Sequence, residues 1–397
     1  MLRVLTLSSL FPDASRPNLG VFVERQTLGL AAHADVEVHV VSARGLPPPP
    51  LDRHPHYAAL RGLPAREAWK GLDVHRPRFL AFPATGGRFH AGMLARAVAP
   101  VLDRLRNEGF AFDVIDASFF FPDGPAAVAL GRRYDVPVSI KARGADIHHW
   151  GNAPATRAQV LAAGRAADGL LAVAGSLRDD MIGLGMPGEH IRVHHTGVDL
   201  QAFRPAADRA AAKAALGIAG PLVVSVGALI PRKGHDLTLA AVARLPGVQC
   251  RIAGEGPERT KLEAQIAALG IADQAQLLGA VPHSDLPALF AAADVLSLPS
   301  SSEGLANAWV EALASGTPVV TCDVGGAREA IDRPAAGRIV SRDVGSIATA
   351  IGELLVAPHP AADVRAAALR FTWDANAVAL RNHLAGLVER RRQASSG

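Results

Sequence analysis

The sequence predicts an α/β protein with two domains, each built on a doubly wound parallel sheet. Short apolar runs alternate with helical patterns through both halves of the chain, which is typical of parallel sheets with crossover helices. The same plan starts again at a new apolar strand, Pro221–Val226. A length of 397 residues suits two domains of ordinary size, each able to bury its own core. In such sheets ligands bind beyond the carboxyl ends of the strands, so functional residues are expected in the loops that follow strands.

The first half begins with a strand, and a helix is predicted over Gly20–Ala32. A proline-rich loop at Leu46–Pro50 and an irregular segment with short helices at Asp52–Trp69 come after the second strand. The strands predicted in this half are Leu2–Ser9, Val36–Ala43, Asp73–Phe79, Asp113–Ala117, Val136–Ala142, Gly169–Ala174 and Arg192–His195.

The second half repeats the alternation, and its tail from Phe371 through Arg392 has a helical pattern. Domain boundaries are predicted at residues 1–198 and 199–371, with residues 372–397 as a C-terminal helix. The strands predicted in this half are Pro221–Val226, Val248–Ile252, Gln276–Leu278, Asp294–Leu298 and Val319–Thr321.

The stretch SLPSSSEGLANAWVEALASGTPVV, residues 297–320, reads as a strand, a tight loop and a helix. The start of such a helix presents unpaired N–H groups and favours an anion such as a phosphate. Glu303 and Glu311 are expected at the two ends of this helix, which separates their backbones by roughly 12 Å along its axis. That separation is comparable to the length of a nucleoside diphosphate sugar. The alternative is a capping acid followed by a solvated helical glutamate.

Two further loops of the second half carry residues suited to a phosphate. Gly227 ends the first strand, and Arg232 and Lys233 follow it, with charges that suit a diphosphate. The alternative is a basic pair that caps a loop. Gly254 and Gly256 come after the second strand, where they allow the backbone to approach a nucleotide, although G-x-G also fits any tight turn.

The first half offers candidates after two of its strands. Gly20, before the first helix, permits close approach of the backbone to a phosphate or an acceptor, or else forms a simple helix entry. Arg143 cannot release a proton at neutral pH, so it would stabilise phosphate charge or orient a substrate. Asp146 and His148 are candidates for contacts with the sugar or acceptor, and a purely structural role is the alternative for the histidine.

Several segments in their order along the chain resemble the retaining nucleotide-sugar glycosyltransferases of family 4, which have two Rossmann-like domains (the GT-B fold). The resemblance covers nearly the whole chain and rests on FPDASRPNLGVFV, KARGADIHH, HHTGVDLQAFRP, VGALIPRKGHDL, IAGEGPE and SEGLANAWVEALASGTPVV. The sequence departs from the family pattern at Ala228, where an arginine is frequent, and at Arg143, where many relatives have histidine before the glycine.

The resemblance implies a hexosyl transfer in which the second domain binds a nucleotide-diphosphate sugar and the first binds a glycan or lipid-linked acceptor. Glu303 would hold sugar hydroxyls, Glu311 the ribose, and Lys233 with Arg232 the leaving diphosphate. The other residues implied in donor binding are Gly20, Arg143, Gly227, Gly254, Gly256, Val281, Gly304, Leu305 and Ala306, and Asp146 and His148 complete the catalytic set. The linker 195–205 would join the domains, and the C-terminal helix would cross back to the first.

We expect no metal and no cofactor besides the co-substrate, because no D-x-D-like motif follows a strand. The resemblance is greatest to enzymes of bacterial envelope or extracellular polysaccharide biosynthesis. UDP, GDP and ADP all remain open as the nucleotide. The rival functions are a nucleotide-sugar epimerase of the same fold, which would need an internal acid/base set, and a non-catalytic nucleotide-sugar-binding subunit.

The cysteines, the apolar runs and the basic residues indicate where in the cell the protein acts. Cys250 and Cys322 lie in apolar runs without metal-type spacing, which indicates buried thiols in a reducing cytosol. The sequence shows neither a signal peptide nor an apolar run of about 18 residues, so we expect a cytoplasmic protein without nucleic-acid partners. A basic face is either solvated or lies peripherally on the inner face of the membrane. Its arginines are Arg88, Arg96, Arg104, Arg106, Arg132, Arg133, Arg390, Arg391 and Arg392.

Overall fold

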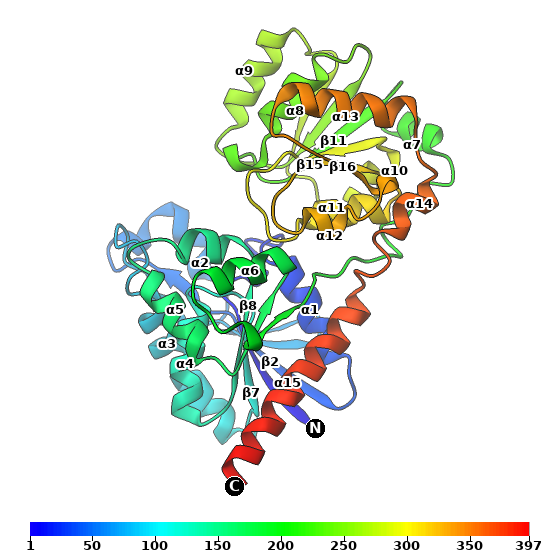
Figure 1. Ribbon diagram of the computed structural model, residues 1–397. Coiled ribbons are helices and arrows are strands. Elements are labelled where there is room, and N and C mark those ends of the chain that lie inside the picture. The colour runs from blue at the N-terminus through cyan, green and yellow to red at the C-terminus, as the bar shows by residue number, and fades with distance from the viewer. Residues whose placement is uncertain (397) are drawn as a thin grey trace. The chain divides into compact units, whose positions relative to one another are not determined.

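The computed structural model describes residues 1–396 and divides the chain into two compact units. Unit 1 comprises Met1–Gly197 together with the chain from Trp373 onward, and unit 2 comprises Val198–Thr372 (Figure 1). Each unit contains its own parallel sheet with helices packed against it. The predicted fold class, two Rossmann-like α/β domains, is therefore confirmed.

Unit 1 is built on an eight-stranded sheet of order β10-β9-β8-β7-β1-β2-β5-β4. All neighbours in it are parallel except β4, which pairs with β5 in the antiparallel sense. The strands are β1 (Leu2–Leu7), β2 (Val36–Val41), β4 (Arg66–Trp69), β5 (Leu72–His75), β7 (Val114–Ala117), β8 (Val138–Ala142), β9 (Gly169–Ala172) and β10 (Ile191–Val193).

The core of unit 1 is shared between its sheet and its last helix. Helix α15 (Trp373–Ser396) packs against α1 (Val21–Ala31), and its Leu380, Leu384 and Leu387 join a buried cluster with Val4 of β1 (Figure 1). The remaining helices are η1 (Leu51–Arg53), η2 (Pro55–Tyr57), α2 (Ala58–Gly62), α3 (His90–Asn107), α4 (Asp123–Tyr134), η3 (Asp146–Trp150), α5 (Arg157–Ala166), α6 (Gly175–Gly183) and η4 (Gly188–His190).

Unit 2 is built on a six-stranded, wholly parallel sheet of order β13-β12-β11-β14-β15-β16. The strands are β11 (Leu222–Val226), β12 (Gln249–Ala253), β13 (Ala275–Gly279), β14 (Val295–Ser297), β15 (Val319–Cys322) and β16 (Gly337–Val340). The helices are α7 (Arg209–Ala215), η5 (Pro231–Lys233), α8 (His235–Val242), α9 (Arg259–Leu269), α10 (Leu286–Ala292), α11 (Asn307–Ala314), α12 (Ala327–Ala330), η6 (Pro334–Ala336), α13 (Val344–Val356) and α14 (Ala361–Ala366).

The region after β2 differs from the prediction. The single strand predicted over Asp73–Phe79 is two strands, because the chain leaves the large sheet at Arg76 and Pro77 and continues as β6 (Arg78–Leu80). Strand β6 pairs with β3 (Arg44–Leu46) in a separate two-stranded sheet. Proline lacks an N–H for the ladder, and the Arg76 side chain is buried and donates to the carbonyl of Pro12. The prediction also missed β3, β4 and β16.

Among the described residues, no helix combines the length and the apolar character needed to cross a membrane.

Candidate functional site

Three charged side chains meet at the loops that follow β11 and β14 of unit 2. Lys233 Nζ lies 2.6 Å from Glu303 Oε1, and Arg232 Nη1 lies 3.4 Å from Glu303 Oε2. Arg232 also donates to the carbonyl oxygen of Ser302. The side chains of Glu303 and Lys233 are only 8% and 14% exposed. The sequence-predicted residues Arg232, Lys233 and Glu303 thus form one partly desolvated charge cluster.

The sheet and a glycine bring these two loops together. Strands β11 and β14 are adjacent and parallel, so their carboxyl ends lie side by side. Gly234 has φ +71°, and a Cβ there would lie 2.5 Å from the carbonyl oxygen of Pro299. The N–H of Ser301 donates to the carbonyl of Arg232 at 2.8 Å. Only glycine allows this contact without displacement of the backbone.

The same edge of the unit 2 sheet carries Gly227, Gly254 and Gly256. The structure gives a different reason why these positions are glycine. A Cβ on Gly254 would lie 1.8 Å from the carbonyl oxygen of Gly227, and one on Gly256 would lie 2.4 Å from that of Leu229. The close approach that these glycines permit is therefore between two loops of the chain itself. Whether the backbone also approaches a nucleotide there stays a prediction.

The prediction that Glu303 and Glu311 stand at the two ends of one helix is wrong. Helix α11 begins at Asn307, four residues after Glu303, and Glu311 lies inside it. The segment before α11 is held by tertiary bonds instead, since the N–H of Gly326 donates to the carbonyl of Gly304 at 2.6 Å. Ala306 is the N-cap and contributes no side-chain cap. The N–H of Trp309 donates to the Ala306 carbonyl at 3.0 Å, which leaves the N–H groups of Asn307 and Ala308 for an anion.

Gly304, Leu305 and Ala306 form the buried turn between Glu303 and α11. A Cβ on Gly325, which has φ +52°, would lie 2.4 Å from the carbonyl oxygens of both Glu303 and Gly304. Gly325 therefore supports the loop that carries Glu303, and the sequence analysis missed it. The available signal was a glycine pair in the loop after a predicted strand.

Glu311 is paired with a residue that the sequence analysis also missed. His283 Nε2 lies 2.9 Å from Glu311 Oε1, and the ring of His283 packs edge-on against Phe203 at 5.5 Å between centroids. His283 lies in the loop between β13 and α10, two residues after Val281. The signal was a histidine in a loop that follows a strand.

In unit 1, Gly20 is the N-cap of α1, with φ +68°. A Cβ there would lie 2.4 Å from the carbonyl oxygen of Leu10. This geometry supports the helix-entry alternative, because the space that the missing side chain leaves is filled by the protein's own backbone.

Asp146 is fully buried at the start of the π-helical turn η3. Its carboxylate accepts hydrogen bonds from the N–H groups of Arg143 at 2.9 Å, Gly144 at 2.8 Å and Phe120 at 3.0 Å. Burial raises the pKa of Asp146 although these donors favour its charged form. The geometry supports a role in positioning the loop over direct contact with a sugar.

His148 lies on the same turn but is not brought together with Asp146. Its Nε2 lies 2.9 Å from Asp180 Oδ2 of α6, and its side chain is 31% exposed. These two candidates for contacts with the sugar or acceptor therefore occupy different environments.

Arg143 is held beside its loop by three contacts. Its guanidinium lies 4.6 Å from the centroid of the Phe22 ring, its Nε donates to the carbonyl of Ser118 at 2.7 Å, and its Nη2 lies 3.4 Å from Gln26 Oε1. Burial lowers the pKa of Arg143 to about 10, so the side chain remains cationic at neutral pH.

Lys141, two residues earlier, is fully buried and was not selected from the sequence. Its Nζ donates to Gln26 Oε1 at 2.7 Å and lies 2.8 Å from His194 Nδ1. Burial lowers the pKa of Lys141 well below its usual value. The signal was a lysine in an otherwise apolar strand, and its effect is to tie α1 to the loop that carries Arg143.

Comparisons with known proteins agree with this architecture. A family model described as Glycosyltransferase Family 4 matches residues 19–202, and one described as Glycosyl transferases group 1 matches residues 208–370. D-inositol 3-phosphate glycosyltransferases of Mycobacterium tuberculosis and Mycobacterium bovis are 40% identical over 205 residues. That match covers 48% of this chain and spans only 42% of the length of those relatives.

Solved structures share the fold along the whole chain. Sucrose-phosphate synthase from Thermosynechococcus elongatus superposes with a TM-score of 0.79 at 20% identity, and both chains are covered completely. HepE of Anabaena, determined in complex with UDP, has a TM-score of 0.67 at 19% identity, again over 100% of both chains. With its two family domains matched in sequence over residues 19–202 and 208–370 and its fold matched throughout, the chain belongs to the group 1, family 4 glycosyltransferases of the GT-B type.

Proposed function

We propose that the chain is a retaining hexosyltransferase that transfers a sugar from a nucleoside diphosphate sugar to a glycan or lipid-linked acceptor. The observation that carries this proposal is the cluster of Lys233, Arg232 and Glu303 at the carboxyl end of the unit 2 sheet. Two cations and one acid converge there beside the uncapped start of α11. This is the charge pattern that a bound diphosphate linked to a neutral sugar requires.

In this proposal the donor binds to unit 2. Lys233 and Arg232 contact the diphosphate, and the first N–H groups of α11 add partial positive charge. The Glu303 carboxylate accepts hydrogen bonds from sugar hydroxyls once the diphosphate has taken over the two cations. Glu311, positioned by His283, accepts the ribose hydroxyls, and the loop around Val281 contacts the base.

Stabilisation of the leaving diphosphate would supply most of the catalysis. As the bond between the sugar and the diphosphate breaks, negative charge grows on the phosphate oxygens, and fixed cations in a partly desolvated site stabilise it most. Lys233 and Arg232 can do this without a metal ion, which is why we propose a metal-independent reaction. No cofactor besides the nucleotide sugar is needed.

The acceptor is assigned to unit 1, where Arg143 remains cationic. An arginine at this position can orient an acceptor that carries a phosphate or carboxylate. HepE has been determined with UDP-glucose, and the mycobacterial relatives are named for an inositol phosphate acceptor. Both names are compatible with a phosphate-linked donor and an anionic acceptor here. The resemblance in sequence is what supports our proposal of a place in envelope or extracellular polysaccharide biosynthesis.

The test is incubation of the purified chain with a panel of UDP-, GDP- and ADP-sugars, with analysis of both the nucleotide and the sugar. Release of nucleoside diphosphate, with the sugar retained in its original anomeric configuration on an acceptor, supports the proposal. A changed sugar that remains attached to the nucleotide would indicate an epimerase. Binding without turnover across the panel and a set of acceptors would indicate a non-catalytic subunit.

We further propose that the protein acts in the cytoplasm and contacts the membrane peripherally through unit 1. Among the described residues, three of the nine arginines predicted to form a basic face are paired with acids of unit 1: Arg133 with Asp103, Arg391 with Asp135 and Arg392 with Asp113. Arg88 and Arg96 are exposed, and Phe89, next to Arg88 in the chain, is 47% exposed. Sedimentation with anionic but not with zwitterionic vesicles would support this contact, and equal sedimentation with both would contradict it.

A further inference from the structure

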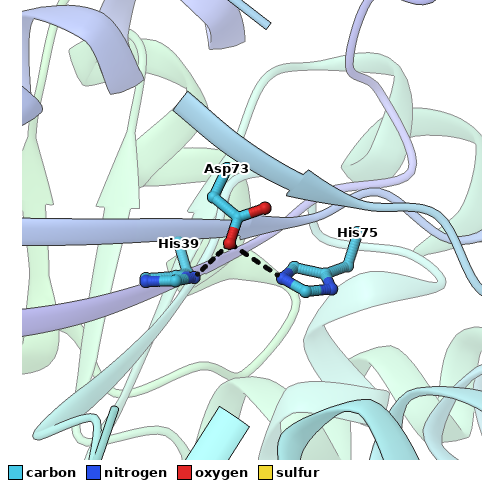
Figure 2. Close-up of side chains that lie close together, drawn as sticks. All are labelled: His39, Asp73 and His75. Atoms are coloured by element: carbon cyan, nitrogen blue, oxygen red, sulfur yellow. Dashed lines mark ion pairs between the residues drawn. The ribbon is translucent and has the colours of Figure 1, made fainter. Parts of the chain in front are cut away.

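Strands β2 and β5 place two histidines and an aspartate on one face of the unit 1 sheet. In β2 the alternation V-E-V-H-V-V sends Val36, Val38 and Val40 into the core and His39 to the opposite face. The register pairs His39 with Asp73 and Val41 with His75. Because side chains alternate along a strand, His39, Asp73 and His75 project from the same face and converge (Figure 2).

The distances within this cluster suit metal coordination. Asp73 Oδ2 lies 3.2 Å from His39 Nδ1 and 3.3 Å from His75 Nε2 (Figure 2). The three ligand atoms all lie within 4.8 Å of one another. In a tetrahedral zinc site with bonds of about 2.0–2.1 Å, neighbouring ligand atoms are about 3.3 Å apart.

Both ring nitrogens that face Asp73 are buried. His39 Nδ1 and His75 Nε2 each lie within ion-pair distance of Asp73 Oδ2. Two buried ring nitrogens thus face one carboxylate oxygen, and a cation bound among them would have all three atoms as ligands.

Neighbouring side chains hold Asp73 and His39 in place. Arg66 donates to both oxygens of Asp73, at 2.9 and 2.7 Å, and the Phe110 ring lies 4.0 Å from the ring of His39 between centroids. A carboxylate has about four lone-pair sites, so this pairing leaves Oδ2 able to bind a cation. Glu37 Oε1 lies 3.9 Å from His39 Nε2, the ring nitrogen that faces away from Asp73, which is beyond hydrogen-bond distance.

We propose that His39, Asp73 and His75 bind a divalent transition-metal cation of the Zn²⁺ class. Two imidazole nitrogens and one carboxylate oxygen are donors that zinc prefers, whereas Mg²⁺ and Ca²⁺ prefer oxygen ligands alone. Three protein ligands leave a fourth position for water. The site is distinct from the charge cluster of unit 2 and independent of the proposed transfer reaction.

The metal would join two strands near the edge of the sheet. Beyond β5 only the short antiparallel strand β4 continues the sheet, and Arg66 of β4 is the residue that holds Asp73. A cation bound by His39 on β2 and by Asp73 and His75 on β5 therefore stabilises the folded form of this edge. Binding to the folded chain and not to the unfolded chain raises the unfolding temperature.

The experiment uses the full-length chain, stripped of metal with EDTA and dialysed. Zn²⁺ is titrated in competition with a chromophoric chelator, Co²⁺ binding is followed by visible absorption, and thermal unfolding is measured with and without Zn²⁺. We expect one equivalent bound, a Co²⁺ spectrum typical of four-coordinate sites, and a higher unfolding temperature with Zn²⁺. His39→Gln and Asp73→Asn should each weaken binding by about 100-fold or more.

His54→Gln is the matched control, because it removes an exposed histidine of the same unit. Circular dichroism of each variant verifies folding, and His39→Gln is the decisive variant because His39 is partly exposed and glutamine fills a similar space against Phe110. Zn²⁺ affinity that is equal in wild type, His39→Gln and His54→Gln would overturn the proposal. So would the absence of a Co²⁺ spectrum, or an unfolding temperature that Zn²⁺ raises equally in wild type and His39→Gln.

Discussion

Replacement of Glu303 by glutamine tests the charge cluster of unit 2 most directly. In the structure the Glu303 carboxylate neutralises Lys233 at 2.6 Å and lies 3.4 Å from Arg232. A nucleoside diphosphate that binds to the same two cations must compete with this carboxylate. Glutamine keeps the size of the side chain and removes its charge, so Glu303→Gln should bind a nucleoside diphosphate more tightly than wild type does.

The size of the effect follows from the geometry. At an effective dielectric constant of about 20, two unit charges separated by that distance attract by about 6 kcal/mol, and most of this is offset by desolvation. A net contribution of about 1.5–3 kcal/mol is usual for a hydrogen bond between charged groups. Because Arg232 can serve both anions, we expect the lower end of this range, or about a tenfold gain in affinity.

The assay is calorimetric titration of UDP, GDP and ADP into wild type and Glu303→Gln. Glu263→Gln is the matched control, because Glu263 is an exposed glutamate of α9 that pairs with Arg259 at 3.0 Å. It removes the same charge from unit 2 without touching the cluster. The affinity for the intact donor and the rate of transfer should change in the opposite direction. Both should be lower in Glu303→Gln than in wild type, because the sugar hydroxyls lose their hydrogen-bond acceptor.

Two results would refute the reasoning. If Glu303→Gln binds every nucleoside diphosphate with the affinity of Glu263→Gln, the cations of the cluster do not hold the diphosphate. If Glu303→Gln turns over like wild type, Glu303 does not contact the sugar.

Three further predictions follow from other contacts. Glu311→Ala should weaken nucleoside diphosphate binding by about 1.5–3 kcal/mol, because a carboxylate that accepts the ribose hydroxyls is lost, and wild-type affinity in a calorimetric titration would remove Glu311 from the site. Chelation with EDTA at a temperature where the stripped chain remains folded should leave transfer largely intact, and a complete loss that magnesium reverses would contradict a metal-independent reaction. Burial raises the pKa of Asp123 from 3.8 to about 7. Between about pH 4 and 7 the folded chain therefore retains a proton that the unfolded chain has released. The free energy of unfolding should fall as pH rises through this range, by at most about 4 kcal/mol from this group. Asp123→Asn should flatten that slope in denaturant titrations from pH 4 to 8, and an unchanged slope would show that Asp123 is ionised in the folded chain.

The sequence alone determined the fold class and most strands of the two sheets. The first strand of each half, predicted at Leu2–Ser9 and Pro221–Val226, is found at Leu2–Leu7 and Leu222–Val226. These elements are readable because a buried parallel strand is a short apolar run, and that signal is carried by neighbouring residues. The family resemblance rests equally on local segments, and it identified Glu303, Lys233 and Arg232 as members of one site.

Other features depended on contacts between residues far apart in the chain. The segment before the start of α11 at Asn307 is held by the backbone bond between Gly304 and Gly326, which no local pattern encodes. Asp146 looks like a catalytic acid in the sequence, yet the folded backbone surrounds it with N–H donors.

The cluster of His39, Asp73 and His75 illustrates the same limit. Each residue lies in an ordinary strand, and only the parallel register of β2 against β5 brings them onto one face within coordination distance. Hydrophobic periodicity and composition are properties of residues that are neighbours in the sequence. Strand register and contacts between loops depend instead on hydrogen bonds and packing between residues far apart in the sequence. The tertiary structure alone therefore decided which charged and polar side chains meet.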